Sequence, residues 1–438
     1  MFKIFFLILF LANYTVNAGS ISCTIPTGDS LEAEKNYNLA EEYSRQGKFD
    51  SALIFYEKAL VIFEEKKYFS RWASCLCSNG LSLNEYGETQ RAFQTAEKGL
   101  ILCEENLPKN HIIIGKCNNA LATILTDLGK IKEASDAYLL ALKIAKINYG
   151  EKHPAVAATL SNLSMTYRIM GDLEKAVESS LASIEIYSSL FGPEEEDLAP
   201  AYFNLASSYT ESGDYDNSIN CVKHAIRIVE KKFGPIHPNL GRCYGSLGNI
   251  YYLQNNLPES FKNFSYGIQI MKKNFGENYP PLSVEYGNLA SSFQKASIQD
   301  SALNYYRLSA NIRRLATGVD NPMLAITYLN MGISFMHLNQ NDSAEFYLEK
   351  SHLLKEKVFG KKHPGVGLTF SCLGDLYINK KEYMKALSFY QQALVAIVAD
   401  FNNMDIYTNP NLDKFSSSVY LLDLLETKAI ALEKLHIQ

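Results

Sequence analysis

The stretch YGEKHPAVAATLSNLSMTYRIMGDLEKAVESSLASIEIYSSLFGPE, residues 149–194, decides the fold because its pattern recurs every 42 residues. Nine turn positions follow one another at this spacing, except for a first interval of 40: Gly47, Gly87, Gly129, Gly171, Gly213, Asn255, Ser297, Asn339 and Lys381. A period of about 20–50 residues is typical of a solenoid of stacked units. The chain is therefore predicted to hold another molecule along its length rather than to catalyse a reaction.

Small residues recur on both sides of each turn. The position seven before it holds Ala40, Gly80, Ala122, Ser164, Ala206, Gly248, Ala290, Gly332 and Gly374. The position five after it holds Ala52, Ala92, Ala134, Ala176, Ser218, Ser260, Ala302, Ala344 and Ala386, and the position twelve after it is equally small. Large apolar or aromatic residues stand four before the turn. Such spacings mark one face of a helix, so each repeat is predicted to be two helices whose axes approach closely at the small residues.

The loop between repeats is equally regular. Gly150, Gly192, Gly234, Gly276, Gly318 and Gly360 lie 21 residues after a turn, and Pro154, Pro238, Pro280, Pro322 and Pro364 lie 25 after it. Glycine with positive φ ends a helix, and proline suits the first turn of the next one. The second helix of each repeat is therefore predicted to stop at glycine, and the next repeat to start at proline.

These columns resemble the tetratricopeptide repeat (TPR). The 42-residue form looks most like the repeats of kinesin light chains and their bacterial relatives. The resemblance implies an all-α fold, a right-handed superhelical solenoid of about nine helix hairpins over residues 31–399, plus a C-terminal capping helix. The chain also resembles the repeat arm of bacterial proteins that carry a caspase-like peptidase domain of the CHAT type. No such domain follows the repeats in this sequence.

Both ends depart from the repeat. Residues 1–18, MFKIFFLILFLANYTVNA, have one lysine, a short apolar run and small residues before Ala18. This pattern predicts a cleavable signal peptide cut after Ala18, hence a secreted or periplasmic protein. The alternative, a membrane anchor, needs about 20 apolar residues, so no stable span is expected after cleavage. Residues 19–30 are predicted to be a linker.

The period breaks again near the C-terminus. Residues 400–414 are predicted to be a linker, and residues 415–438 a helix that matches the first helix of a repeat at Ala429 and Leu432. A terminal repeat needs a polar outer face. Asp423, Glu426, Lys428, Glu433 and Lys434 are predicted to supply it. The chain is either capped by this helix or a shortened relative of the CHAT-type proteins.

Composition narrows the partners. The chain is 47% hydrophobic and 20% charged with a net charge of −5. It shows no basic stripe, so nucleic acid is not an expected partner. Its eight cysteines lack zinc-ligand spacing. Cys103 and Cys117 flank one loop and form a possible disulfide, the alternative being buried free thiols. His153, His237 and His363 are one loop element repeated, so no metal is predicted.

A ligand groove is predicted along the first helices. Nine residues before the turn, Asn occurs in five of nine repeats: Asn38, Asn162, Asn204, Asn288 and Asn330. The family resemblance implies that Asn here contacts bound peptide, and its amide can both donate and accept hydrogen bonds. The alternative is that these residues tie adjacent helices together. Lys116 and Arg242, thirteen before the turn, could meet an acidic ligand group, or could be ordinary solvated charges.

Two functions remain open. The first is an exported, non-enzymatic scaffold that binds a peptide or protein in its concave groove. The second is a regulatory or sensory arm of a split CHAT-type or signalling system that acts through a separate chain. Sequence motifs for nucleophilic, metal-dependent and phosphate-loop chemistry are missing, so neither catalytic residues nor a cofactor is predicted.

Overall fold

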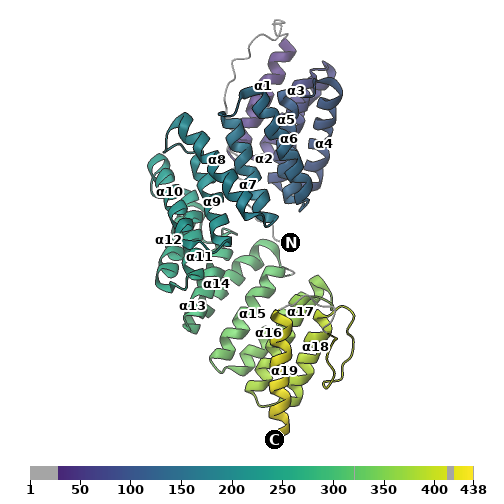
Figure 1. Ribbon diagram of the computed structural model, residues 1–438, viewed down its shortest axis with the longest axis vertical. Helices are drawn as coiled ribbons and strands as arrows, with labels where there is room; N and C mark the ends of the chain where they lie inside the picture. The colour runs from purple at the N-terminus through teal and green to yellow at the C-terminus, as the bar shows by residue number, and fades with distance from the viewer. Residues whose placement is uncertain (1–27, 320, 412–418, 438) are drawn as a thin grey trace. The chain divides into compact units, whose positions relative to one another are not determined.

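A computed structural model describes residues 28–319, 321–411 and 419–437. The predicted signal peptide, 1–18, and residues 19–27 lie outside the described residues. The chain divides into two compact units, Met1–Lys232 and Phe233–Gln438. Every regular element in the described ranges is a helix (Figure 1). The predicted all-α class is confirmed.

The first unit consists of five pairs of helices. They are α1 (Gly28–Arg45), α2 (Phe49–Glu65), α3 (Phe69–Tyr86), α4 (Thr89–Asn106), α5 (Ile112–Asp127), α6 (Ile131–Tyr149), α7 (Pro154–Ile169), α8 (Leu173–Phe191), α9 (Leu198–Glu211) and α10 (Tyr215–Phe233), whose last residue is the first of the second unit.

The second unit continues the same order. Its helices are α11 (Pro238–Leu253), α12 (Leu257–Phe275), α13 (Leu282–Lys295), α14 (Gln299–Thr317), α15 (Pro322–His337), α16 (Asn341–Phe359), α17 (Pro364–Asn379), α18 (Tyr383–Ile397) and α19 (Val419–Ile437). In both units we call the odd-numbered helices A and the even-numbered helices B. Helices A and B of one repeat pack together, as α3 does on α4 and α11 on α12, and each B helix packs on the next A helix within its unit. The predicted hairpin solenoid is thus present in each unit.

Small residues sit where helices A and B cross, as predicted. All nine residues five positions after the turn are 0% exposed. A Cβ atom added to Gly248 would lie 2.7 Å from the ring of Phe264, which leaves no room for a larger residue. Where the small residue is serine it also bonds the partner helix: the Ser260 hydroxyl donates to the carbonyl oxygen of Gly248 at 2.8 Å.

The two glycine positions differ in backbone conformation. The turn residue Gly87 has φ 100° and ψ 4°, and the non-glycine turns Asn255, Ser297, Asn339 and Lys381 have φ of 57–63°. This left-handed region admits other residues at a cost. The loop glycine Gly150 has φ 81° and ψ 177°, a region that essentially only glycine adopts. This difference explains why the loop position is always glycine in these six repeats whereas the turn position varies.

Histidine begins several A helices. Nδ1 of His111, His153, His237 and His363 each accepts a hydrogen bond from the backbone N–H two residues later, and Asn321 does the same through Oδ1. The histidines are therefore N-caps. The predicted proline start is confirmed for Pro154, Pro238, Pro322 and Pro364, but α13 begins at Leu282, two residues after Pro280.

The C-terminal helix corrects one prediction. Lys428, expected on the polar outer face, is 1% exposed. Its ammonium donates to Gln391 Oε1 at 2.6 Å, Thr408 O at 2.8 Å and Asn409 Oδ1 at 2.8 Å. The lysine therefore joins α19 to α18 and to the connecting segment 398–411. The sequence pattern missed this because the acceptors lie in the segment that breaks the repeat.

Candidate binding face of the A helices

The predicted groove residues all lie on A helices. In the first unit Asn38 is on α1, Lys116 on α5, Asn162 on α7 and Asn204 on α9. In the second unit Arg242 is on α11, Asn288 on α13 and Asn330 on α15. We call the surface formed by these register positions, nine to thirteen residues before each turn, the A-helix face. It repeats along each unit, so one residue type can meet successive parts of an extended ligand.

The asparagines on this face divide into two groups. Asn204 Nδ2 donates to the backbone oxygen of Ser161 at 2.9 Å and to its hydroxyl at 3.1 Å. It therefore ties α9 to α7. The Asn330 side chain acts on the Tyr306 hydroxyl of the preceding B helix, whose pKa it tends to lower. These two residues fit the structural alternative.

The other three asparagines remain available to a ligand. No side-chain hydrogen bond joins Asn38, Asn162 or Asn288 to any other described residue, and all three are at least partly exposed. An amide that has no partner among the described residues and is reached by solvent can bond water or ligand. These residues fit the groove prediction by their placement.

Lys116 is a cation without a partner among the described residues. Its side chain is exposed, and it has no ion pair or hydrogen bond with the described residues. Partial burial of its ammonium and the charge of Arg71 on α3 lower the pKa of Lys116, against the opposing effect of Glu41. Arg71 itself is paired with Glu34, at 2.7 Å between Nε and Oε1. An anion bound beside Lys116 would relieve this unfavourable environment.

Glu285 on α13 is a residue that the sequence patterns did not indicate. It belongs to the A-helix face, twelve residues before its turn, and burial raises the pKa of its carboxyl to about 7, while Arg242 on α11 acts in the opposite direction. An isolated glutamate in a helix carries no sequence signal. The sequence feature that accompanies Glu285 is glycine at position 245 on α11, which faces its carboxylate.

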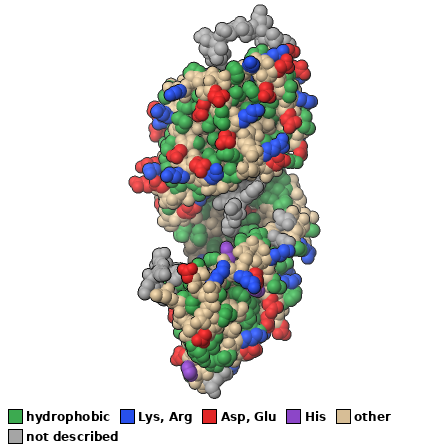
Figure 2. Space-filling model, turned by 90° about the vertical axis from the view of Figure 1, so that its right-hand side faces the viewer, with side chains coloured by type: hydrophobic (Ala, Val, Ile, Leu, Met, Phe, Trp, Pro, Cys, Tyr) green, Lys and Arg blue, Asp and Glu red, His purple; other side chains and the backbone are tan. Residues whose placement is uncertain are grey.

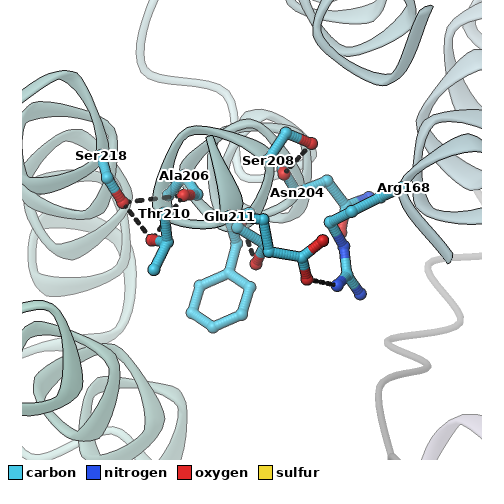
Figure 3. A network of polar contacts seen from close by, with 9 residues as sticks. Arg168, Asn204, Ala206, Ser208, Thr210, Glu211 and Ser218 are labelled. Carbon is cyan, nitrogen blue, oxygen red and sulfur yellow. Dashed lines mark hydrogen bonds and ion pairs between the residues drawn. The ribbon is translucent and has the colours of Figure 1, made fainter. Parts of the chain in front are cut away.

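Polar pairs also join successive A helices at their C-terminal ends. Arg168 on α7 pairs with Glu211 on α9, as Figure 3 shows, and Asn84 Nδ2 donates to Asp127 Oδ2 at 2.5 Å. Both pairs are 43 residues apart. Figure 3 also shows Ser218 of α10 reaching Thr210 and the carbonyl of Ala206. These contacts hold neighbouring helices together and are not available for a ligand.

A buried tyrosine supports four of the hairpins. Tyr56, Tyr138, Tyr306 and Tyr390, nine residues after their turns, bond Glu41, Thr123, Ser291 and Asp375 respectively, each fifteen residues earlier, at 2.7–3.0 Å. In the five repeats without this tyrosine the partner position is apolar three times and polar twice: Leu81, Met165, Ile333, Ser207 and Asn249. All four tyrosines thus stand opposite a polar residue. This partial correlation was visible in the sequence and could have suggested the pair.

The cysteines differ from the predicted pairing. Cys117 on α5 forms a disulfide with Cys77 on α3, whereas Cys103 on α4 stays a free thiol with its Sγ 3.7 Å from that of Cys117. Cys77 and Cys117 occupy facing positions of adjacent A helices, a contact that loop symmetry ignores. Cys103 and Cys117 therefore lie close together, but the disulfide bond of Cys117 is with Cys77.

The described residues give no sign of a metal or membrane site. No group of three or more His, Cys, Asp and Glu side chains in these ranges could hold a metal ion. None of the described helices is long and apolar enough to cross a membrane. On the face drawn in Figure 2, acidic and basic side chains are interspersed.

Helix pairs with small crossing residues and a repeated A-helix face define a helical-repeat protein. The tetratricopeptide repeat family model matches residues 116–189, 197–265 and 322–395, and a second model of the same description matches 33–64, together more than half of the chain. The chain belongs to the tetratricopeptide repeat family.

Solved structures agree with this fold. The apo form of the quorum sensor NprR from B. thuringiensis is 13% identical with a TM-score of 0.58, over 84% of this chain and 99% of that one. A signal transduction ATPase with numerous domains (STAND) and a tetratricopeptide repeat sensor, from Pyrococcus horikoshii, is 15% identical with a TM-score of 0.57, over 86% of this chain and 55% of that one.

The kinesin light chain likeness also appears among solved structures. TPR-like repeats assigned to a kinesin light chain of Podosopora anserina are 19% identical with a TM-score of 0.41, over 47% of this chain and 98% of that one. A comparison with curated protein sequences finds no match. The CHAT-type resemblance stays a prediction.

Proposed function

We propose that this chain is an exported, non-catalytic scaffold that holds a peptide or protein along its A-helix face. Its membership in the tetratricopeptide repeat family supports a role in protein interaction, because stacked repeats offer an extended binding surface. The signal peptide at residues 1–18, cut after Ala18, is part of this proposal and places the scaffold outside the cytoplasm.

One observation carries the proposal: polar groups recur on the A-helix face without partners among the described residues. The amides of Asn38 and Asn162 in the first unit, and of Asn288 in the second, can each bond an extended backbone through a donor and an acceptor. The Lys116 ammonium adds a site for a carboxylate of the ligand. Had the groove asparagines all been engaged as Asn204 is, the structural alternative would explain them fully.

The proposal is tested by selection of peptides from a random display library on residues 19–438. The variant Asn38→Ala, Asn162→Ala, Asn288→Ala should lose the selected peptides while its helical circular dichroism and melting temperature stay unchanged. Lys116→Gln should lose preferentially those peptides that carry acidic residues.

The matched control is Asn204→Ala. It removes the tie to Ser161 and should lower stability by about 1 kcal/mol while it leaves peptide binding largely intact. The scaffold proposal fails if the wild type selects no peptide, or if the triple asparagine variant loses its fold.

One specific observation favours the regulatory-arm alternative. The outer face of α19 exposes Leu422, Ile430 and Ile437, with exposed fractions of 52%, 41% and 78%. A separate chain that docks there would be lost from co-purification when these three residues are changed to serine, and would be unaffected by the triple asparagine variant.

A further inference from the structure

The carboxylate of Glu285 has no partner in the described protein. No hydrogen bond reaches either oxygen, no ion pair within 4.0 Å involves it, and Oε2 is inaccessible to solvent. Leaving a charged oxygen desolvated and unbonded is unfavourable. Two other enclosed acids have partners: Glu41 accepts from Tyr56 at 2.9 Å and Asp375 from Tyr390 at 2.7 Å. Glu285 lacks such a donor, and this difference calls for a physical reason.

The neighbouring helix makes room for this carboxylate. A Cβ atom at Gly245 on α11 would lie 2.6 Å from Oε2 and 2.8 Å from Oε1 of Glu285, so any side chain at 245 would push the carboxylate away. Gly287, the equivalent residue of the next repeat, also lacks a side chain, and a Cβ there would meet nothing closer than 3.5 Å. Most other repeats carry a side chain at this position, such as Phe203 and Leu329. Gly245 therefore provides the space between α11 and α13 in which the Glu285 carboxylate lies.

The surrounding cations do not neutralise Glu285 directly. Arg242 on α11 attracts the carboxylate but forms no ion pair with it within 4.0 Å. Arg313 on α14 directs its guanidinium at Met323 O, at 2.5 Å, Thr327 Oγ1, at 3.0 Å, and Ser283 O, at 3.4 Å. Lys272 on α12 is bound to Glu277 at 2.8 Å.

A second polar group lies beside the carboxylate. Asn288 follows Glu285 by three residues on α13, so the two side chains occupy the same face of the helix. Its amide has no partner in the described chain. A carboxylate and an amide oxygen are the acceptors that a cationic N–H group requires.

We propose that Glu285 and Asn288 form a subsite on the A-helix face of the second unit for a cationic nitrogen group, the ammonium of a lysine or the guanidinium of an arginine in the bound segment. The inference names the chemistry of the partner and rests on the proposed function for its setting. The raised pKa of Glu285 has the same physical origin, because burial without a partner favours the neutral acid. A bound cation supplies the missing donor and favours the ionised form, so binding near pH 7 releases a proton.

The test uses small cationic probes so that no peptide partner is needed. N-acetyl-lysine methylamide and N-acetyl-arginine methylamide are titrated into residues 19–438 and followed by amide chemical shifts, with N-acetyl-norleucine methylamide as the uncharged control. Saturable binding of either cation, about tenfold or more weaker in Glu285→Gln and weaker also in Asn288→Ala, is expected. The two probes separate a preference for lysine from one for arginine.

Two controls keep the outcome interpretable. Glu285→Gln is nearly isosteric and removes an unpartnered charge, so its melting temperature should equal or exceed that of the wild type. Glu349→Gln, which changes an exposed carboxylate on α16, should leave probe binding unchanged. Titration in two buffers of different ionisation enthalpy should show proton release in the wild type and none in Glu285→Gln.

The inference is overturned if neither cation binds saturably, or if Glu285→Gln binds as tightly as the wild type. Its failure differs from that of the scaffold proposal. Peptides that bind without any preference for Lys or Arg would leave the scaffold proposal standing and remove the cation subsite. Cation binding that depends on Glu285, in a protein that selects no peptide, would support the cation subsite and remove the scaffold proposal.

Discussion

Changing Lys428 to methionine should loosen the end of the second unit. The lysine stands eight residues before the position at which the next turn would fall, where other repeats have Leu121, Leu163, Leu205, Leu247, Leu289, Met331 and Leu373. Methionine is close to lysine in volume and shares the apolar character of this position, where Met331 already occurs. By sequence comparison alone the substitution should be neutral or stabilising.

The structure predicts the opposite. The ammonium satisfies three oxygens, of which Gln391 Oε1 is in a buried contact and Thr408 O and Asn409 Oδ1 are in partly buried ones. A buried acceptor left unbonded costs about 1–3 kcal/mol, and a partly exposed one costs less because water can reach it. Relief of the buried positive charge offsets part of the loss. We expect a net destabilisation of about 2–4 kcal/mol, confined to α18, α19 and residues 398–411.

Hydrogen exchange followed by mass spectrometry measures this effect locally. Peptides from 398–411 and from α19 should exchange about 30-fold or more faster in Lys428→Met, since about 1.4 kcal/mol corresponds to a tenfold change, and peptides from the first unit should not change. Lys434→Met, an exposed change on the same helix, is the matched control. Unchanged or slower exchange in Lys428→Met would show that desolvation of the ammonium outweighs its three bonds, and would refute the reasoning.

Three further predictions concern the hairpins. Burial lowers the pKa of His111, His153 and His237 below the ordinary 6.5. As the pH falls, the histidines of the unfolded chain therefore take up protons before those of the folded chain. Their contribution to stability is complete above pH 6.5 and is lost as the pH falls below it. Changing all three to Asn, the cap that Asn321 already provides, should flatten the dependence of the unfolding free energy on pH in that range; an unchanged slope would mean that the caps do not titrate on unfolding. Tyr138→Phe should cost about 1 kcal/mol, and a double-mutant cycle with Thr123→Val should give a coupling energy of about 0.5–1.5 kcal/mol; additive effects would show that the 2.8 Å contact contributes nothing. In Cys77→Ser, non-reducing peptide mapping should find Cys103 joined to Cys117, and Cys117 left as a free thiol would contradict the proximity of the three sulfurs.

The sequence predicted the backbone arrangement better than it predicted the side-chain contacts. The repeat interval predicted the hairpins, the small crossing residues and the loop glycines because each is imposed by local geometry that recurs at a fixed spacing. The same reasoning placed Lys428 on the outside, because a long break in the period hides which segment returns to contact α19. It also paired Cys117 with Cys103 because it compared distances along one loop and left out the contact between successive A helices.

The candidate site was predicted only as a surface. The register of Asn204 is identical to that of Asn162, yet the side chain of Asn204 bonds Ser161 and the side chain of Asn162 bonds no described residue. The difference depends on side-chain rotamers and on the residue one repeat earlier. A column in the sequence therefore locates a face of the helix, but it cannot tell an amide that holds the protein together from one that is open to a ligand.

The choice of turn residue gives the two units different responses to temperature. All five turns of the first unit use glycine, and the four turns of the second use Asn255, Ser297, Asn339 and Lys381. Closing a hairpin through glycine restrains the most flexible residue of the unfolded chain, an entropic cost that grows on heating. Closing it through another residue at positive φ costs conformational energy, about 1–2 kcal/mol for most side chains and less for asparagine, which depends little on temperature. The first unit thus carries its turn penalty mainly as entropy and the second mainly as enthalpy, so heating raises the cost of hairpin closure in the first unit more than in the second.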